Sequence, residues 1–153
     1  MVLNLSDGGN FTNAGTFTAT NGVITMNGSS QTLGGASVIT LDTLVIASGT
    51  TTLGGNVTTT SNDTIKSLAT LKGSSYTLTT AGNFIDNGTF YTPSSSTVYF
   101  NKNGHQCIQG TSTPTFQNLT ISALTTLGTS SSINIDGTVT VLPGGVMACT
   151  CTP

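Results

Sequence analysis

Residues 9–17 read GNFTNAGTF, and residues 82–90 read GNFIDNGTF. Six of the nine positions are identical, at an offset of 73 residues. Further matches follow at offsets of 74 and 75: residues 23–27 with 97–101, 31–35 with 106–110, and 51–53 with 125–127. Short insertions in turns produce this kind of drift. The chain is therefore interpreted as a tandem duplication, with copies over about 9–80 and 82–142 and a tail at 143–153.

Within each copy, apolar residues alternate with Thr, Asn or Ser. The clearest runs are Val23-Ile24-Thr25-Met26, Leu44-Val45-Ile46, Tyr76-Thr77-Leu78, Asn118-Leu119-Thr120-Ile121, Ile133-Asn134-Ile135 and Val139-Thr140-Val141. A period of two predicts strands with one buried face. Asn-Gly, Gly-Gly and Asp-Gly pairs separate the runs, and these residues favour turns. The pattern predicts an all-β protein.

A shorter rhythm predicts the architecture. The steps from Phe11 to Leu33, Leu53 and Tyr76 are 22, 20 and 23 residues, and coils of roughly 20–25 residues are typical of solenoids. We predict one domain over residues 1–153, a parallel β-helix of about seven coils. The alternative is an antiparallel β-sandwich, because Asn-Gly and Asp-Gly also form hairpin turns. The sandwich would not require its turns to recur at matching offsets, so the solenoid is favoured.

Composition excludes several classes of function. Charged residues make up only 5% of the chain, Arg and Glu are absent, and the net charge is −2. Phosphate binding needs clustered Lys and Arg, so nucleic acid is an unexpected partner. No apolar run approaches a membrane span, and residues 1–7 lack the basic and apolar regions of a signal peptide. A surface rich in Thr, Ser, Asn and Gly favours an extracellular or cell-surface location.

The repeated residues resemble those of a known class. GNFTN with GTF, followed by an alternating strand, a QTL segment and the FQNLTI run at 116–121, is similar to repeats in large secreted bacterial surface proteins. These are right-handed parallel β-helices of the filamentous-haemagglutinin and autotransporter-adhesin kind. The resemblance spans residues 9 to about 142 and implies a scaffold. It supplies no catalytic residues, and the tail after Pro143 has no counterpart in the first copy.

No constellation for catalysis stands out, and we predict neither an enzyme nor a cofactor or metal site. General acid–base chemistry needs paired groups within hydrogen-bond reach. The five aspartates are spread along the chain, and those of Asp7-Gly8, Asp86-Asn87-Gly88 and Asp136-Gly137 are typical of turns. A nucleophilic pair of His105 with Cys107 would lack an orienting third residue. Zinc binding by His105 and the cysteines would lack the usual paired spacing.

The three cysteines have another use. Cys149 and Cys151 lie in the tail, and Cys107 lies far upstream. An odd number of cysteines in a secreted chain suggests a cross-link between subunits. The alternative is an intramolecular disulfide between Cys107 and one of the tail cysteines. Both alternatives stay open at the level of sequence.

Three functions follow from these features. The first is an extracellular structural protein that assembles end to end with itself, or continues a larger repetitive chain, to make a filament or surface stalk, because a solenoid has two open ends. The second is an adhesin or glycan-binding module for a host surface, with Tyr76, Tyr91 and Tyr99 as candidate anchors. Of these, Tyr76 and Tyr99 lie on strands predicted to face the core. The third is ice binding, since Thr-x-Thr runs would stack into flat threonine rows.

Overall fold

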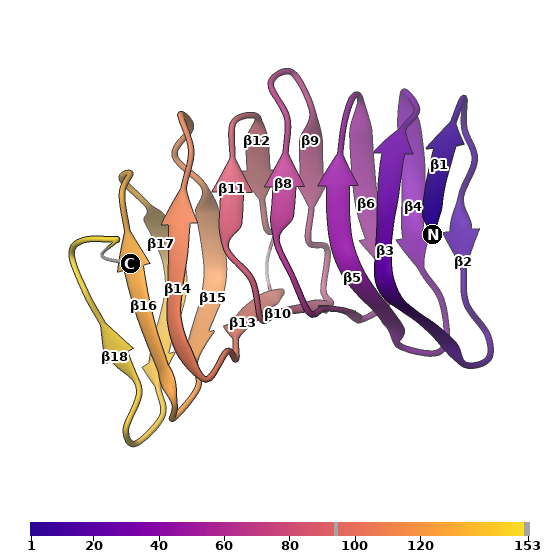
Figure 1. Ribbon diagram of the computed structural model, residues 1–153. Coiled ribbons are helices and arrows are strands. Elements are labelled where there is room, and N and C mark those ends of the chain that lie inside the picture. The colour runs from indigo at the N-terminus through magenta and orange to yellow at the C-terminus, as the bar shows by residue number, and fades with distance from the viewer. Residues whose placement is uncertain (94, 152–153) are drawn as a thin grey trace.

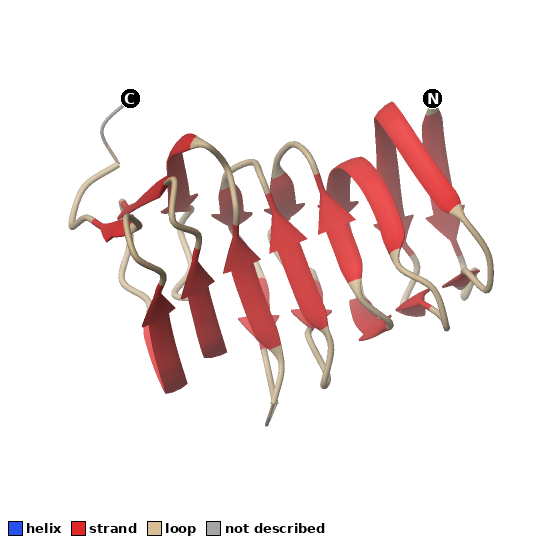
Figure 2. Cartoon of the chain, turned by 90° about the horizontal axis from the view of Figure 1, so that it is seen from below, coloured by secondary structure: helices blue, strands red, loops and turns tan. Residues whose placement is uncertain are grey.

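The structure is a column of parallel strands. The computed structural model describes residues 1–93 and 95–151. All 18 of its strands belong to one sheet, every pairing between neighbouring coils is parallel, and the chain winds through about seven turns. Figure 1 shows the coils side by side, with the two termini at opposite ends. Figure 2 shows strands and loops and no helix in the described residues. The predicted parallel β-helix is confirmed, and the antiparallel sandwich is wrong.

The coils have three faces, each a stack of parallel strands. Face 1 contains β1 (Val2–Ser6), residues 23–27 of β3 (Phe17–Asn27), residues 44–46 of β5 (Ile39–Ile46), β8 (Asp63–Ile65), β11 (Phe84–Asp86), β14 (Gly104–Gln109), β16 (Thr125–Thr129) and β18 (Val146–Met147). Face 2 contains β2 (Phe11–Thr12), β4 (Ser30–Gly34), β6 (Thr50–Gly54), β9 (Thr70–Lys72), β12 (Thr89–Tyr91), residues 115–116 of β15 (Thr115–Ile121) and residues 134–135 of β17 (Asn134–Val141). Face 3 contains residues 17–19 of β3, 39–41 of β5, β7 (Val57–Thr59), β10 (Thr77–Thr80), β13 (Thr97–Phe100), residues 118–121 of β15 and 138–141 of β17.

Inward-facing side chains fill the column. In each strand every second residue points inward, which is the period of two seen in the sequence. The result is one continuous core that runs from Ile24 through Phe84 to Leu127. The second copy adds an aromatic cluster, in which the Phe84 ring lies 4.8 Å from Phe90 and 5.7 Å from Phe116. Phe11 and Phe17 form the matching pair of the first copy, at 4.7 Å.

Asparagine side chains link successive coils. The Oδ1 atoms of Asn10, Asn56, Asn62, Asn83 and Asn87 each accept a hydrogen bond from a backbone N–H one coil further along, at 2.7–3.0 Å. These bonds reach 21 to 24 residues along the chain. An asparagine at a corner therefore satisfies a backbone donor that the sheet ladder leaves unpaired.

One detail of the predicted coil rhythm is wrong. Phe11, Leu33 and Leu53 are aligned on face 2 as expected. The next strand in that stack is β9, where Leu71 lies opposite Thr51. Tyr76 lies at the following corner, before β10, and is 36% exposed. The coil here is shorter than the spacing to Tyr76 suggested.

The sequence repeat is not a whole number of turns. Phe11 lies on face 2, whereas its counterpart Phe84 lies on face 1. Likewise Ile24 lies on face 1 and its counterpart Val98 on face 3. Each copy thus advances by three coils and two further faces, so equivalent residues of the two copies lie one face apart around the column.

Candidate functional site

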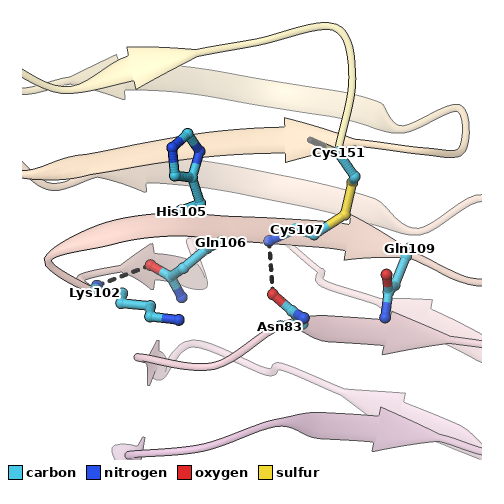
Figure 3. Close-up of a pocket in the computed structure, with 7 residues that line it drawn as sticks. All are labelled: Asn83, Lys102, His105, Gln106, Cys107, Gln109 and Cys151. Carbon is cyan, nitrogen blue, oxygen red and sulfur yellow. Dashed lines mark hydrogen bonds between the residues drawn. A yellow bond between two sulfur atoms is a disulfide. The ribbon is translucent and has the colours of Figure 1, made fainter. Parts of the chain in front are cut away.

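A shallow pocket of about 370 Å³ opens on the outside of face 1 (Figure 3). Its lining residues are Asn83, Lys102, His105, Gln106, Cys107, Gln109 and Cys151. Most of them come from β14, on which His105, Cys107 and Gln109 point outward and Gln106 inward. The pocket is the place where the sequence-predicted histidine and two of the cysteines meet.

The polar groups at the base of the pocket are already bonded to backbone. Gln106 Nε2 donates to the carbonyl oxygens of Thr80 and Gly82, at 2.9 and 2.6 Å, and its Oε1 accepts from the N–H of Lys102 at 2.8 Å. Asn83 Oδ1 accepts from the N–H of Cys107 at 2.9 Å, and Figure 3 draws this bond together with the one between Lys102 and Gln106. Gln106 and Asn83 therefore hold coils together and leave little for a ligand.

The structure joins Cys107 and Cys151 in a disulfide, with their Cα atoms 5.5 Å apart. Cys149 is exposed and carries a free thiol. Because the Cys107 sulfur is bonded to Cys151, it cannot form a thiolate nucleophile with His105. The same bond occupies two of the sulfurs that were weighed as zinc ligands. Among the described residues, no group of three or more His, Cys, Asp or Glu side chains is placed to hold a metal ion.

The tail that carries Cys151 turns back along the column. After β18 the chain leaves the strand path, and Thr150 crosses the outside of β16 at Gly128, where a Cβ would collide with the Thr150 carbonyl. Cys151 then reaches Cys107 on β14, in the coil before that of β16. The disulfide thus fastens the last strand of face 1 to the coils beneath it (Figure 3).

Two aspartates are buried, and neither of them lines this pocket. Asp63 is 1% exposed on face 1, opposite Leu44 on one side and Phe84 on the other. Burial raises its pKa to about 7, against hydrogen bonds from Thr80 and Thr59 that lower it. Burial also raises the pKa of Asp86, against the N–H groups of Gly88 and Phe90. One carboxylate oxygen of each has no hydrogen-bond partner in the described residues.

The remaining aspartates occupy corners. Asp7 adopts a left-handed backbone conformation with φ of 48° in a turn. Asp136 lies exposed in the bend of β17 between face 2 and face 3. The turn prediction for Asp86 is confirmed in part. Its Oδ1 accepts a hydrogen bond from Gly88 N–H at 3.1 Å, as in a turn, but its side chain is buried. The buried position of Asp63 was not predicted from the sequence. The pattern that indicates it is the alternation of Asp63 with Ile65, which places both side chains inward.

Face 3 presents a row of outward side chains along the column. The register aligns one residue in each coil: Thr18, Thr40, Thr58, Thr79, Tyr99, Thr120 and Thr140. Tyr99 was predicted to face the core, and this is wrong, because Val98 and Phe100 on either side take the inward positions. The same correction applies to Tyr76, which is exposed. The third tyrosine, Tyr91, is 47% exposed on face 2.

Both ends of the column leave apolar side chains partly uncovered. At the N-terminal end, Leu3, Leu5, Phe11 and Phe17 pack against the core on one side only, and Ile133 and Ile135 do so at the other end. Val139 and Val141 of the last coil are 40% and 43% exposed. Within the described residues there is also no helix long and apolar enough to cross a membrane.

The fold defines the class of protein as a parallel β-solenoid with an internal duplication. No protein-family model, curated protein or solved structure matches the chain. Function is therefore inferred from the features of the column itself.

Proposed function

We propose that this chain is an extracellular structural protein that associates end to end with further copies to form a filament or a surface stalk. The observation that carries the proposal is the pair of apolar ends. Leu5 and Phe11 at one end and Ile135 and Val139 at the other are core residues that lack a coil on one side. Covering such side chains is the main favourable contribution to association in water.

The lateral surface supports a scaffold role. Only 5% of residues are charged, and the outward rows consist mostly of Thr, Ser and Asn. The pocket beside β14 contains one imidazole and one ammonium group, and its Gln106 and Asn83 amides are bonded to backbone. The disulfide supports an oxidising compartment, because such bonds persist mainly outside the cytosol.

Electron microscopy of the purified chain over a range of concentrations tests the proposal, together with sedimentation. We expect thin filaments that lengthen with concentration. Val139→Lys places a charge on the C-terminal end and should abolish them, whereas Thr58→Lys places the same charge on a lateral row and should leave them intact. Circular dichroism checks that both variants fold. A wild-type chain that stays a dispersed monomer at every concentration would refute the proposal.

A second candidate function is an adhesin or glycan-binding module. It is favoured by Tyr76 and Tyr91, two aromatic residues that are 36% and 47% exposed. Exposed aromatic rings stack on sugars and on partner side chains. A glycan array probed with the wild type and with Tyr91→Ala tests it, and an array without tyrosine-dependent binding would eliminate it.

The threonine row of face 3 favours ice binding as a third candidate. Neighbouring threonines along this row are spaced by the distance between strands, about 4.8 Å, in an uncharged array that Tyr99 interrupts. Thermal hysteresis in the presence of the protein, reduced by Thr58→Lys, is the expected result. A freezing point that the protein leaves unshifted would eliminate this candidate.

A further inference from the structure

We infer that successive molecules stack with a rotation of one face, so that β1 of one molecule pairs with residues 134–135 of β17 in the next. The inference rests on the proposed end-to-end assembly and specifies its geometry. It is drawn from the junction between the two copies inside the chain, which serves as a template for the junction between molecules.

The two copies contain the same number of strand segments. Because β3, β5, β15 and β17 each bend across two faces, the 18 strands supply 22 segments. The first copy takes the eleven from β1 to β9, and the second takes the eleven from β10 to β18. Eleven segments are three coils and two faces, which is the advance that separates Phe11 from Phe84.

Register fixes which residues are equivalent. Leu3 lies opposite Ile24, and Leu78 lies opposite Val98, the counterpart of Ile24. Leu3 therefore corresponds to Leu78, and β1 to β10. The glutamine bonds agree, because Gln31 bonds the carbonyl of Leu5 where Gln106 bonds that of Thr80.

Inside the chain, the second copy begins by covering the end of the first. Strand β10 pairs with β7, where Leu78 lies opposite Val57. Strand β11 then pairs with β8, where Phe84 lies opposite Asp63. Strand β12 pairs with β9. These three pairings close the first copy.

The C-terminal end presents the same three strands without a cover. Residues 134–135 of β17 correspond to β7, residues 138–141 to β8, and β18 to β9. In the first copy the chain continues from β9 into β10. In the second it turns back after β18 and is tied to Cys107 through Cys151. The described residues therefore leave the place that corresponds to β10 unfilled.

Strand β1 suits this place because it is the counterpart of β10. If two molecules stack as the two copies do inside the chain, Leu3 lies opposite Ile133, Leu5 opposite Ile135, and Phe11 opposite Val139. All six side chains are only partly buried or exposed in the single chain. The position of the buried Asp63 is taken by Val139, so the junction between molecules is more apolar than the internal one. The occupant of the open end is thus a second copy of this chain.

Cysteine cross-linking tests the rotation. The rule places Asn4 of one molecule opposite Asn134 of the next, both exposed and outward. Register partners in adjacent strands lie about 4.8 Å apart, within the Cα range of a disulfide. In a Cys149→Ser background, we would mix an Asn4→Cys chain with an Asn134→Cys chain and oxidise them. The control mixture pairs Asn4→Cys with Thr140→Cys, which lies on the next face.

We expect a cross-linked dimer from the Asn134→Cys mixture and none from the control on a non-reducing gel. Filaments that cross-link through Thr140→Cys instead, or through neither partner, would overturn the rotation and leave the assembly proposal standing. Chains that neither assemble nor cross-link would refute both. Microscopy of each mixture before oxidation distinguishes these outcomes.

Discussion

Gln31 and Gln106 make the same three hydrogen bonds on neighbouring faces of the column. The Nε2 of Gln31 donates to the carbonyls of Leu5 and Gly9, at 3.0 and 2.7 Å, and its Oε1 accepts from Gly28 N–H at 2.7 Å. Gln106 repeats this with Thr80, Gly82 and Lys102. Each buried amide thus joins two coils at a point where backbone groups lack ladder partners.

Replacing Gln106 by leucine should lower the free energy of unfolding by about 2–4 kcal/mol, because three backbone groups lose their partner. Gln31→Leu should cost a similar amount. Urea denaturation measures both. Gln109→Leu, on the outer side of the same strand, is the matched control and should change little. Equal effects at positions 106 and 109 would contradict the role assigned to the buried amide.

Asn13 and Asp86 form a second equivalent pair, and here the two copies differ. Asn13 Oδ1 accepts from Gly15 N–H as Asp86 Oδ1 accepts from Gly88 N–H, both at 3.1 Å. Asn13 Nδ2 also donates to the carbonyl of Val38 at 2.9 Å, whereas Asp86 Oδ2 has no partner. Asp86→Asn should therefore stabilise the protein at neutral pH by about 1 kcal/mol. The reverse change, Asn13→Asp, should destabilise the protein. Thermal melts in which Asp86→Asn is less stable than the wild type, or Asn13→Asp more stable, would contradict this interpretation.

Asp63 should make the protein more stable in acid. Its pKa is raised from 3.8 to about 7 in the folded state, so the folded carboxyl keeps its proton while the unfolded one ionises. The contribution is fully present below about pH 4 and is lost as the pH rises to about 7, by roughly 4 kcal/mol. Denaturation at a series of pH values should show this fall, and Asp63→Asn should flatten it. If the stability of Asp63→Asn falls with pH as steeply as that of the wild type, the pH dependence does not come from Asp63.

The disulfide between Cys107 and Cys151 spans 44 residues. Cys151→Ser should lower the free energy of unfolding by about 2–4 kcal/mol, since a cross-link restricts the unfolded chain. Cys149→Ser is the control and should have little effect. Peptide mapping by mass spectrometry under non-reducing conditions checks the pairing, and a Cys107–Cys149 linkage in the map would be the contrary result.

The all-β class, the parallel coils and the duplication could be predicted because each leaves a local pattern. Alternation marks Val23 to Met26 as a strand, and the recurrence of GNF and GTF marks the two copies. The turn residues are equally local, as at Gly35 and Gly110, whose φ values of 133° and 131° suit glycine. A Cβ at either would collide with the carbonyl of Asn13 or Asp86.

The rotation between copies was not predictable, because it depends on the length of every coil. Whether an offset of 73 to 75 residues corresponds to a whole number of turns depends on how many residues each corner contains. One such corner places Tyr76 outside the face 2 stack that contains Leu53. Asp63 was missed because a lone carboxylate between polar neighbours resembles a turn residue. Cys107 pairs with Cys151 and not with Cys149 because of the path of the tail across Gly128. The spacing of the cysteines in the sequence does not reveal this path.

Helical reconstruction of assembled protein by electron cryo-microscopy is the most direct test of the end-to-end column. At about 4.8 Å per coil, the 22 segments predict an axial rise of about 35 Å per molecule. All molecules should point in the same direction. Each should be rotated from the one before it by one face, in addition to the twist of the coils. A rise well above this value, copies in alternating directions, or particles that never lengthen would contradict the account.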